Sequence, residues 1–127
     1  MLHHKCKTLM VGAVLTCFAL PVMAQTAYDT TYGVVYGSVD NSNQFTGTYD
    51  SYPSGFIHLK GNGQGYYAGY WAQSSSKYSC ATQQAGRNQQ MTSYWGRLEV
   101  QETAEGLLGK WSYCNAAPSE AWQAVPK

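Results

Sequence analysis

The chain has 127 residues and a nearly balanced charge, with eight basic and seven acidic side chains and a formal net charge of +1. A chain of this length is expected to build one small domain rather than several. It carries no basic patch, which argues against nucleic acid as a partner, and no basic amphipathic helix that would lie on a membrane surface.

The first 24 residues have the three-part layout of a secretory signal peptide. Lys5 and Lys7 precede an apolar run from Leu9 to Leu20, and small residues stand at the minus-three and minus-one positions before Gln25. The run is too short for a comfortable transmembrane span. A lipidated Cys17 is the rival interpretation, and it is disfavoured because no small residue directly precedes that cysteine. We expect residues 25–127 to be exported to the periplasm or the medium as a single β-barrel-like domain.

Removal of this leader leaves Cys80 and Cys114 of the four cysteines. An even pair of cysteines in an oxidising compartment is expected to form a disulfide. The bond would close a loop of about 34 residues, which in the chain-entropy model stabilises the fold by about 3–4 kcal/mol. The spacing matches no zinc or redox motif, and the single histidine of the mature part, His58, cannot complete a tetrahedral site. We therefore expect neither a metal nor a cofactor.

In chain order, the mature part predicts three successive β-hairpins. In each, a first strand leads through a turn to a second strand with a glycine at its centre. Asn, Asp and Gly dominate the first two turns because they tolerate the positive φ that tight hairpins need. The expected strand pairs are Tyr32–Val39 with Phe45–Ser51, Gly55–Lys60 with Tyr66–Gln73, and Tyr94–Gln101 with Leu107–Cys114.

The second strands share one local pattern, a glycine with a bulky residue two positions before it and another two positions after it. A strand places alternate side chains on one face, so both bulky residues share a face with the glycine. A glycine inside a strand fits a sharp bend or the close approach of a ring, and small closed barrels need such bends. The bulky residues are Phe45, Tyr67 and Leu107 before the glycines Gly47, Gly69 and Gly109, and Tyr49, Trp71 and Trp111 after them.

The first strands alternate between apolar and polar residues. Ile57 and Leu59 face one way and His58 the other, and Leu98 and Val100 are placed in the same alternating way in the third hairpin. One face is therefore buried and one is wet, which is typical of an antiparallel meander. Closure would also remove the exposed edges of six sequential strands. We predict an all-β fold, a small antiparallel up-and-down meander or barrel of three or more hairpins with one disulfide.

Two segments depart from this pattern. Ser74–Ser93 is rich in Ser and Gln, and it is expected to be a long loop tethered by the disulfide or a loop with one further strand. A loop of this size in a small domain is more often functional or stapled than idle. After Cys114, Asn115–Lys127 is interpreted as a tail that packs through Trp122.

At the first hairpin, the residues YGVVYGSVDNSNQFTGTY from Tyr32 to Tyr49 resemble the opening hairpin of avidin and streptavidin. The later GYW and GKW strands are similar in style to the glycine-aromatic strands of that family. The resemblance implies an up-and-down barrel with one open end. It does not carry biotin binding with it, because only Tyr49 matches a polar ligand contact of the family, while Tyr28 and Tyr32 stand where the serine and asparagine of its first strand would be.

The sequence carries no set of residues that indicates an enzyme. It has no nucleophile elbow, no Ser-His-Asp or Cys-His set, and no paired metal-ligand motif. His58 is expected to be a solvated strand residue. Asp50 and Glu99 could form an acid-base pair, but single carboxylates at strand ends are usually solvated or cap turns.

The aromatic content is high, with eleven tyrosines and four tryptophans. A domain of this size buries only about 60–70% of its unfolded surface, so some rings must remain exposed. Exposed rings favour sugars, protein interfaces or small apolar ligands, and the alternative is that tyrosine merely suits half-buried strands. The candidate binding residues are Tyr36, Tyr49, Tyr52, Tyr70, Trp71, Tyr78, Tyr94 and Trp111, of which Tyr49, Trp71 and Trp111 are expected to belong to the core.

These observations predict an exported, non-enzymatic binding protein. Its partner would be a protein, for example an enzyme that it inhibits or neutralises, or a small molecule or glycan at the barrel mouth, and self-association into a homo-oligomer stays open. The rival prediction is a structural or self-assembling component of the extracellular matrix or surface, because the weakly charged Ser74–Ser93 segment lies beside strongly β-prone strands.

Overall fold

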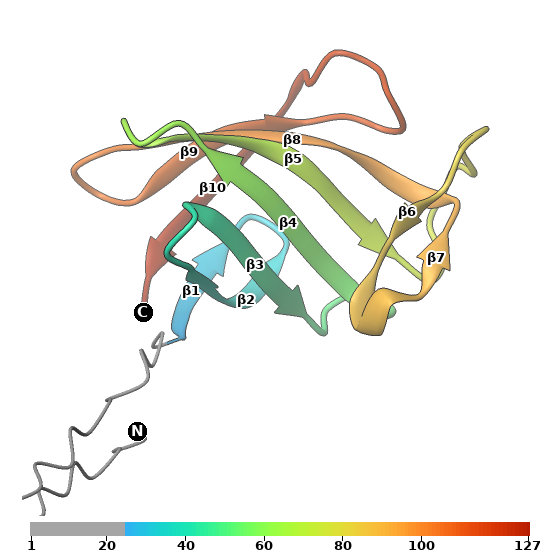
Figure 1. Cartoon of the computed structure of the whole chain (residues 1–127), viewed down its shortest axis with the longest axis horizontal. Helices are drawn as coiled ribbons and strands as arrows, with labels where there is room; N and C mark the ends of the chain where they lie inside the picture. Colours follow the sequence, from blue (N-terminus) through green and yellow to red (C-terminus); the bar gives the residue numbers. More distant parts are fainter. Residues whose placement is uncertain (1–24) are drawn as a thin grey trace, which may run out of the picture.

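The structure is a computed structural model that describes residues 25–127, so the expected signal peptide lies outside the described residues. Eight antiparallel strands close into a barrel, as expected for the fold class (Figure 1). None of the helices in the described part is long and apolar enough to cross a membrane. In the order β1-β10-β9-β8-β5-β4-β3-β2, the barrel strands are β1 (Thr26–Thr30), β10 (Glu120–Pro126), β9 (Leu107–Trp111), β8 (Tyr94–Glu102), β5 (Tyr66–Gln73), β4 (Gly55–Gly61), β3 (Gln44–Tyr49) and β2 (Gly33–Val39).

The three expected hairpins are all present, as the pairs β2–β3, β4–β5 and β8–β9. Their turns have the predicted chemistry. In the first turn Asp40 accepts hydrogen bonds from the backbone N–H groups of Ser42 and Gln44, and Asn43 has a φ of 63°. In the second turn Gly63 and Gly65 have positive φ. The residues of these two turns thus adopt the conformations expected for tight hairpins.

The interpretation of residues 115–127 as a tail is incomplete, because most of them form the strand β10. This strand pairs with β9, where Trp122 lies opposite Gly109, and with β1, which closes the barrel. Trp122 packs in the core as expected, and Ala124 is buried beside it. Neither β1 nor β10 was predicted, because they pair with each other across opposite ends of the chain and no local pattern shows that contact.

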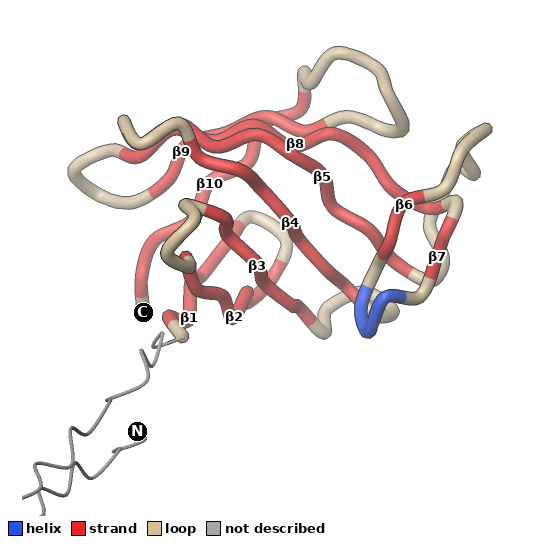
Figure 2. Tube along the Cα trace, in the orientation of Figure 1, coloured by secondary structure: helices blue, strands red, loops and turns tan. Residues whose placement is uncertain are grey.

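The Ser74–Ser93 segment contains two short strands, β6 (Gln84–Ala85) and β7 (Met91–Thr92), joined by the 3-10 turn Arg87–Gln89. They form a small sheet separate from the barrel, at the end of β5 and β8 (Figures 1 and 2). Trp95 donates its indole N–H to the Thr82 carbonyl at 2.8 Å, and Tyr70 donates its hydroxyl to the Ala85 carbonyl at 2.7 Å. Most of the segment is therefore anchored to the outer side of the barrel rather than hanging free.

The interior follows the predicted alternation. Ile57, Leu59, Leu98 and Val100 are each at most 2% exposed. The central glycines also behave as expected: a Cβ on Gly69 would collide with the His58 carbonyl of the neighbouring strand. Close approach of two backbones thus requires glycine at the bend.

The two ends of the barrel are filled differently. One end, which we call the plugged end, carries the hairpin turns after β2, β4 and β8. There Phe45 occupies the space above Gly37 and Gly47, and Tyr28 packs edge-on against it with ring centroids 6.1 Å apart. The other end, which we call the mouth, carries the β1–β2 turn, the β3–β4 loop, the Ser74–Ser93 segment and the β9–β10 loop.

Candidate functional site

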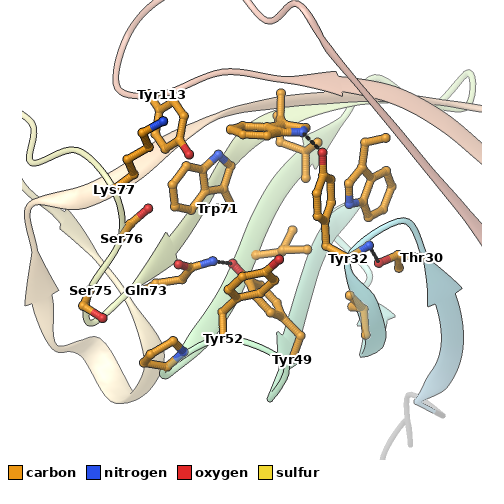
Figure 3. Close-up of a pocket in the computed structure, with 16 residues that line it drawn as sticks. Thr30, Tyr32, Tyr49, Tyr52, Trp71, Gln73, Ser75, Ser76, Lys77 and Tyr113 are labelled. Atoms are coloured by element: carbon orange, nitrogen blue, oxygen red, sulfur yellow. Dashed lines mark hydrogen bonds between the residues drawn. The ribbon is translucent and has the colours of Figure 1, made fainter.

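A cavity of about 430 Å³ opens at the mouth (Figure 3). This volume lies within the range of about 300–1,000 Å³ that is usual for small-molecule sites. Its lining comes from all eight barrel strands and from the loops between them. The lining residues are Thr30, Tyr32, Val35, Tyr49, Tyr52, Pro53, Ile57, Trp71, Gln73, Ser75, Ser76, Lys77, Leu98, Trp111, Tyr113 and Trp122.

The floor of the cavity is apolar, and the wall is aromatic. Val35, Ile57, Leu98 and Trp122 belong both to the floor and to the hydrophobic core. The wall is made by the residue two positions after the central glycine of each second strand, namely Tyr49, Trp71 and Trp111. The repeated glycine-aromatic pattern therefore builds the wall directly.

Hydrogen bonds hold the two wall indoles upright. Trp71 donates its Nε1–H to the Ser112 carbonyl at 3.0 Å, and Trp111 donates to the Tyr32 hydroxyl oxygen at 3.1 Å. The two indole rings are nearly perpendicular, at 85° with centroids 5.9 Å apart, and Tyr113 meets both of them edge-on. Each ring is fixed at its polar atom, so its apolar surface remains available to the cavity.

Tyr49 forms the most buried polar point of the wall. Its hydroxyl oxygen accepts a hydrogen bond of 2.8 Å from Gln73 Nε2, and the residue is 7% exposed. Burial raises the pKa of the Tyr49 phenol to about 12, against the partly opposing effect of the Gln73 hydrogen bond. The phenol is therefore neutral at physiological pH and can both accept and donate hydrogen bonds.

Arg87 fixes the β3–β4 side of the mouth from the outside. Its guanidinium donates to the carbonyls of Tyr49 at 2.7 Å and Gly55 at 2.8 Å, and it forms an ion pair of 3.0 Å with Asp50. One side chain from the Ser74–Ser93 segment thus bridges the start and the end of the β3–β4 loop.

The predicted disulfide is present, and it lies beside the mouth. Cys80 and Cys114 are joined across 34 residues, linking the Ser74–Ser93 segment to the β9–β10 loop. Between them Tyr78 packs edge-on against Tyr113 with ring centroids 4.7 Å apart. The disulfide therefore holds together two loops that border the cavity.

The structure gathers four of the eight candidate binding residues at the cavity, namely Tyr49, Tyr52, Trp71 and Trp111. The other four do not line it. Tyr36 is 44% exposed on β2, Tyr70 is hydrogen-bonded to Ala85, Tyr78 packs on the outer side of Tyr113, and Tyr94 is half-buried at the start of β8. Trp111 is only half-buried because it borders the opening, whereas Tyr49 and Trp71 are core residues as expected.

Several lining residues were not predicted from the sequence. Gln73 and Tyr113 lie two residues beyond Trp71 and Trp111 within the expected strands, so continuing the alternation past the aromatic residue would have indicated them. Tyr32, Ser75 and Lys77 lie in loops, where no periodicity applies. Their place at the cavity depends on how the loops fold over the mouth.

The titratable residues considered for catalysis do not converge. Asp50 pairs with Arg87, and Glu99 pairs with Arg97 at 3.0 Å. His58 lies on β4 with its imidazole near the Thr46 hydroxyl at 3.4 Å. Among residues 25–127, no group of three or more His, Cys, Asp or Glu residues is arranged to hold a metal ion.

Comparison of the chain with protein-family models, with curated proteins and with solved structures finds no match. The function of the chain is therefore inferred from the geometry of the cavity.

Proposed function

We propose that this chain is an exported, non-enzymatic binding protein that holds a small molecule with an apolar, ring-like portion in the mouth cavity. The observation that carries the proposal is the wall of Tyr49, Trp71 and Trp111, whose rings are fixed at their polar atoms and leave their faces beside an open space. A site that is formed before the ligand arrives loses little entropy on binding.

The polar side chains at this cavity comprise the hydrogen-bonded Tyr49 hydroxyl in the wall and a group nearer the rim. Gln73, Ser75, Ser76 and Lys77 border one side of the opening. A mostly apolar pocket with a small number of polar groups is typical of ligand sites. The described residues that line the cavity include no imidazole, carboxylate or thiol, and this composition supports binding rather than turnover.

The resemblance of the first hairpin to avidin and streptavidin supports the same proposal. The tyrosine of FTGTY, Tyr49, is the one residue that matches a ligand contact of that family, and it is also part of the cavity wall. We extend the resemblance to the position of the site and not to biotin.

Export is part of the proposal. It is supported by the signal-peptide layout of the first 24 residues and by the disulfide between Cys80 and Cys114, which is compatible with an oxidising compartment.

A protein partner at the mouth is the second candidate function, including the neutralisation of an enzyme. Exposed rings on separate loops favour it: Tyr32 is 37% exposed, Tyr52 42% and Tyr78 49%. Tyrosine at a rigid rim gives a large contact area at low entropic cost. The structural alternative has less support, because all eight barrel strands are paired on both sides.

The test blocks the opening of the cavity with a bulky side chain. The full chain is produced in its source cells and purified, and native mass spectrometry is used to detect a co-purified small molecule. Ser75 is exposed and lines the cavity, whereas Ser79 is exposed and does not. We expect a small-molecule adduct on the wild type and on Ser79→Trp, and its loss in Ser75→Trp.

An affinity capture from the same cells separates the two candidates. One protein captured in equal amount by the wild type, with no small-molecule adduct, would replace the small-ligand proposal with the protein-partner one. An adduct that survives in Ser75→Trp would place the ligand outside the cavity.

A further inference from the structure

The charges around the mouth point to the class of ligand, an inference that rests on the proposed function. Of the described residues that line the cavity, Lys77 alone carries a formal charge. The nearby carboxylate of Asp50 is paired with Arg87. The lining itself therefore carries one positive charge, and the exposed Glu120 carboxylate lies outside the lining at the start of β10, opposite Trp111.

Lys77 lies where a ligand would enter. Its Nζ lies over the ring of Tyr78, 5.4 Å from the centroid, so the aromatic contact holds the ammonium near the rim. Figure 3 shows Lys77, Ser76 and Ser75 on one side of the cavity, with Tyr32 and Thr30 on the other. The two serine hydroxyls next to Lys77 can donate hydrogen bonds to an anion.

A second donor lies at the opposite side. The Tyr32 oxygen accepts the indole N–H of Trp111, and an indole N–H is only a donor. The Tyr32 hydroxyl proton therefore remains available to an acceptor in the cavity. Donors on both sides favour a ligand whose polar atoms are acceptors.

The aromatic wall favours a flat body below these donors. Trp71, Trp111 and Tyr113 meet at 79–85°, so a ring that stacks on one indole presents its face to the edge of the next. Edge-to-face contacts of this kind are favourable because ring edges are positive and ring faces negative.

Aromatic cages also bind quaternary ammonium groups, and this is the competing ligand class. A cation in this cavity would meet no carboxylate in the lining and would share the opening with Lys77. We infer that the cavity takes an aromatic carboxylate, with its ring against Trp71 and Trp111 and its carboxylate at the rim beside Lys77 and Ser76.

The experiment compares three ligands that share a naphthyl ring and differ in the group at the end of a two-carbon chain. They are naphthylacetate, naphthylethanol and naphthylethylammonium, and their affinities for the full chain purified after export are measured by isothermal titration calorimetry. We expect naphthylacetate to bind most tightly and naphthylethylammonium least tightly. The difference should shrink at about 1 M salt, where the Debye length falls to about 3 Å.

The variant Lys77→Gln tests the origin of the preference. It should lower the affinity for naphthylacetate about two- to fivefold, as expected for the loss of one exposed ion pair, and leave the affinity for naphthylethanol unchanged. Lys60→Gln, which removes an exposed lysine at the plugged end of β4, is the matched control and should leave all three affinities unchanged.

Failure of the inference is distinguishable from failure of the proposed function. Equal binding of the anion and the cation, or a preference that survives in Lys77→Gln, would overturn the inference while the binding of naphthylethanol still supports the cavity as a binding site. Absence of binding by all three at millimolar concentration would overturn both.

Discussion

The two ends of the barrel come from one repeated strand pattern and yet differ in how they are filled. The residue two positions before each central glycine points to the plugged end, where Phe45, Tyr67 and Leu107 pack against the core. The residue two positions after it points to the mouth, where Tyr49, Trp71 and Trp111 each carry a polar atom.

The hydrogen bonds of those polar atoms keep the three rings at the wall of the mouth. Tyr49, Trp71 and Trp111 form hydrogen bonds to Gln73, Ser112 and Tyr32, which lie in or next to the wall, so the rings stay beside the opening. A buried indole or phenol needs such a partner, whereas phenylalanine needs none and can fill the centre. The plugged end is therefore centred on Phe45, a ring without a polar atom, whereas the wall of the mouth consists of rings held by hydrogen bonds.

The largest expected effect on stability comes from truncating one aromatic side chain at each end of the barrel. Phe45→Ala should lower the free energy of unfolding by about 3–5 kcal/mol, because it leaves a cavity under Gly37 and Gly47. Trp111→Ala enlarges a space that is already open, and should cost about 1–2 kcal/mol. Urea denaturation of both variants checks this, and equal costs would mean that the mouth is as tightly packed as the plug.

The next effect concerns the staple at the mouth. The double variant Cys80→Ala, Cys114→Ala should lose about 3–4 kcal/mol of stability, because a loop of 34 residues is no longer closed in the unfolded chain. Amide hydrogen exchange should rise first around Tyr78 and Tyr113, while the turn at Asp40–Asn43 keeps its protection. Uniform loss of protection at both ends would contradict a local role for the disulfide.

A pH titration tests whether water is excluded from the Tyr49 hydroxyl in the wall of the mouth. The pKa of Tyr49 is about 12 in the fold against 10.0 for a free phenol, so the folded state binds the proton more tightly. This stabilisation, about 2–3 kcal/mol, is fully present below pH 10 and is lost as the pH rises from about 10 to 12.

The measurement is the unfolding free energy of the wild type and Tyr49→Phe across that pH range. The difference between them should fall as the pH rises through this range. A flat difference for Tyr49→Phe would mean that water reaches its hydroxyl.

The smallest expected effect concerns Arg87, whose hydrogen bonds link the two ends of the β3–β4 loop. Arg87→Lys keeps the charge but cannot reach both the Tyr49 and Gly55 carbonyls with a fork of donors, and should cost about 1–2 kcal/mol. Arg97→Lys alters an ion pair with Glu99 on partly exposed side chains and should change stability by less than about 0.5 kcal/mol. Thermal unfolding of the two variants provides the comparison. Equal losses of stability would mean that the Arg87 hydrogen bonds do not hold the β3–β4 loop.

Much of this architecture could be predicted from local patterns. Alternation around Ile57 and Leu98 identified the inner face, turn residues such as Asn43 and Gly63 marked the hairpins, and the paired cysteines indicated the disulfide. These signals depend on residues close in sequence or on simple counting, so no tertiary information was needed.

The candidate site could be predicted only in part. Tyr49, Trp71 and Trp111 were identified as rings of the glycine-aromatic strands, but the sequence could not tell that they border an opening. Tyr32 and Lys77 reach the cavity from loops whose paths are set by contacts distant in sequence, such as the hydrogen bond from Trp111 to Tyr32.

By itself the sequence determined an all-β domain of glycine-centred hairpins with one disulfide, because turn chemistry, side-chain alternation and cysteine pairing are local or countable properties. Only the tertiary structure decided that β1 and β10 close the barrel, that the Ser74–Ser93 segment packs partly outside it, and that one end remains open. These features depend on pairing and packing between residues far apart in the chain, and no local pattern encodes which of those partners will meet.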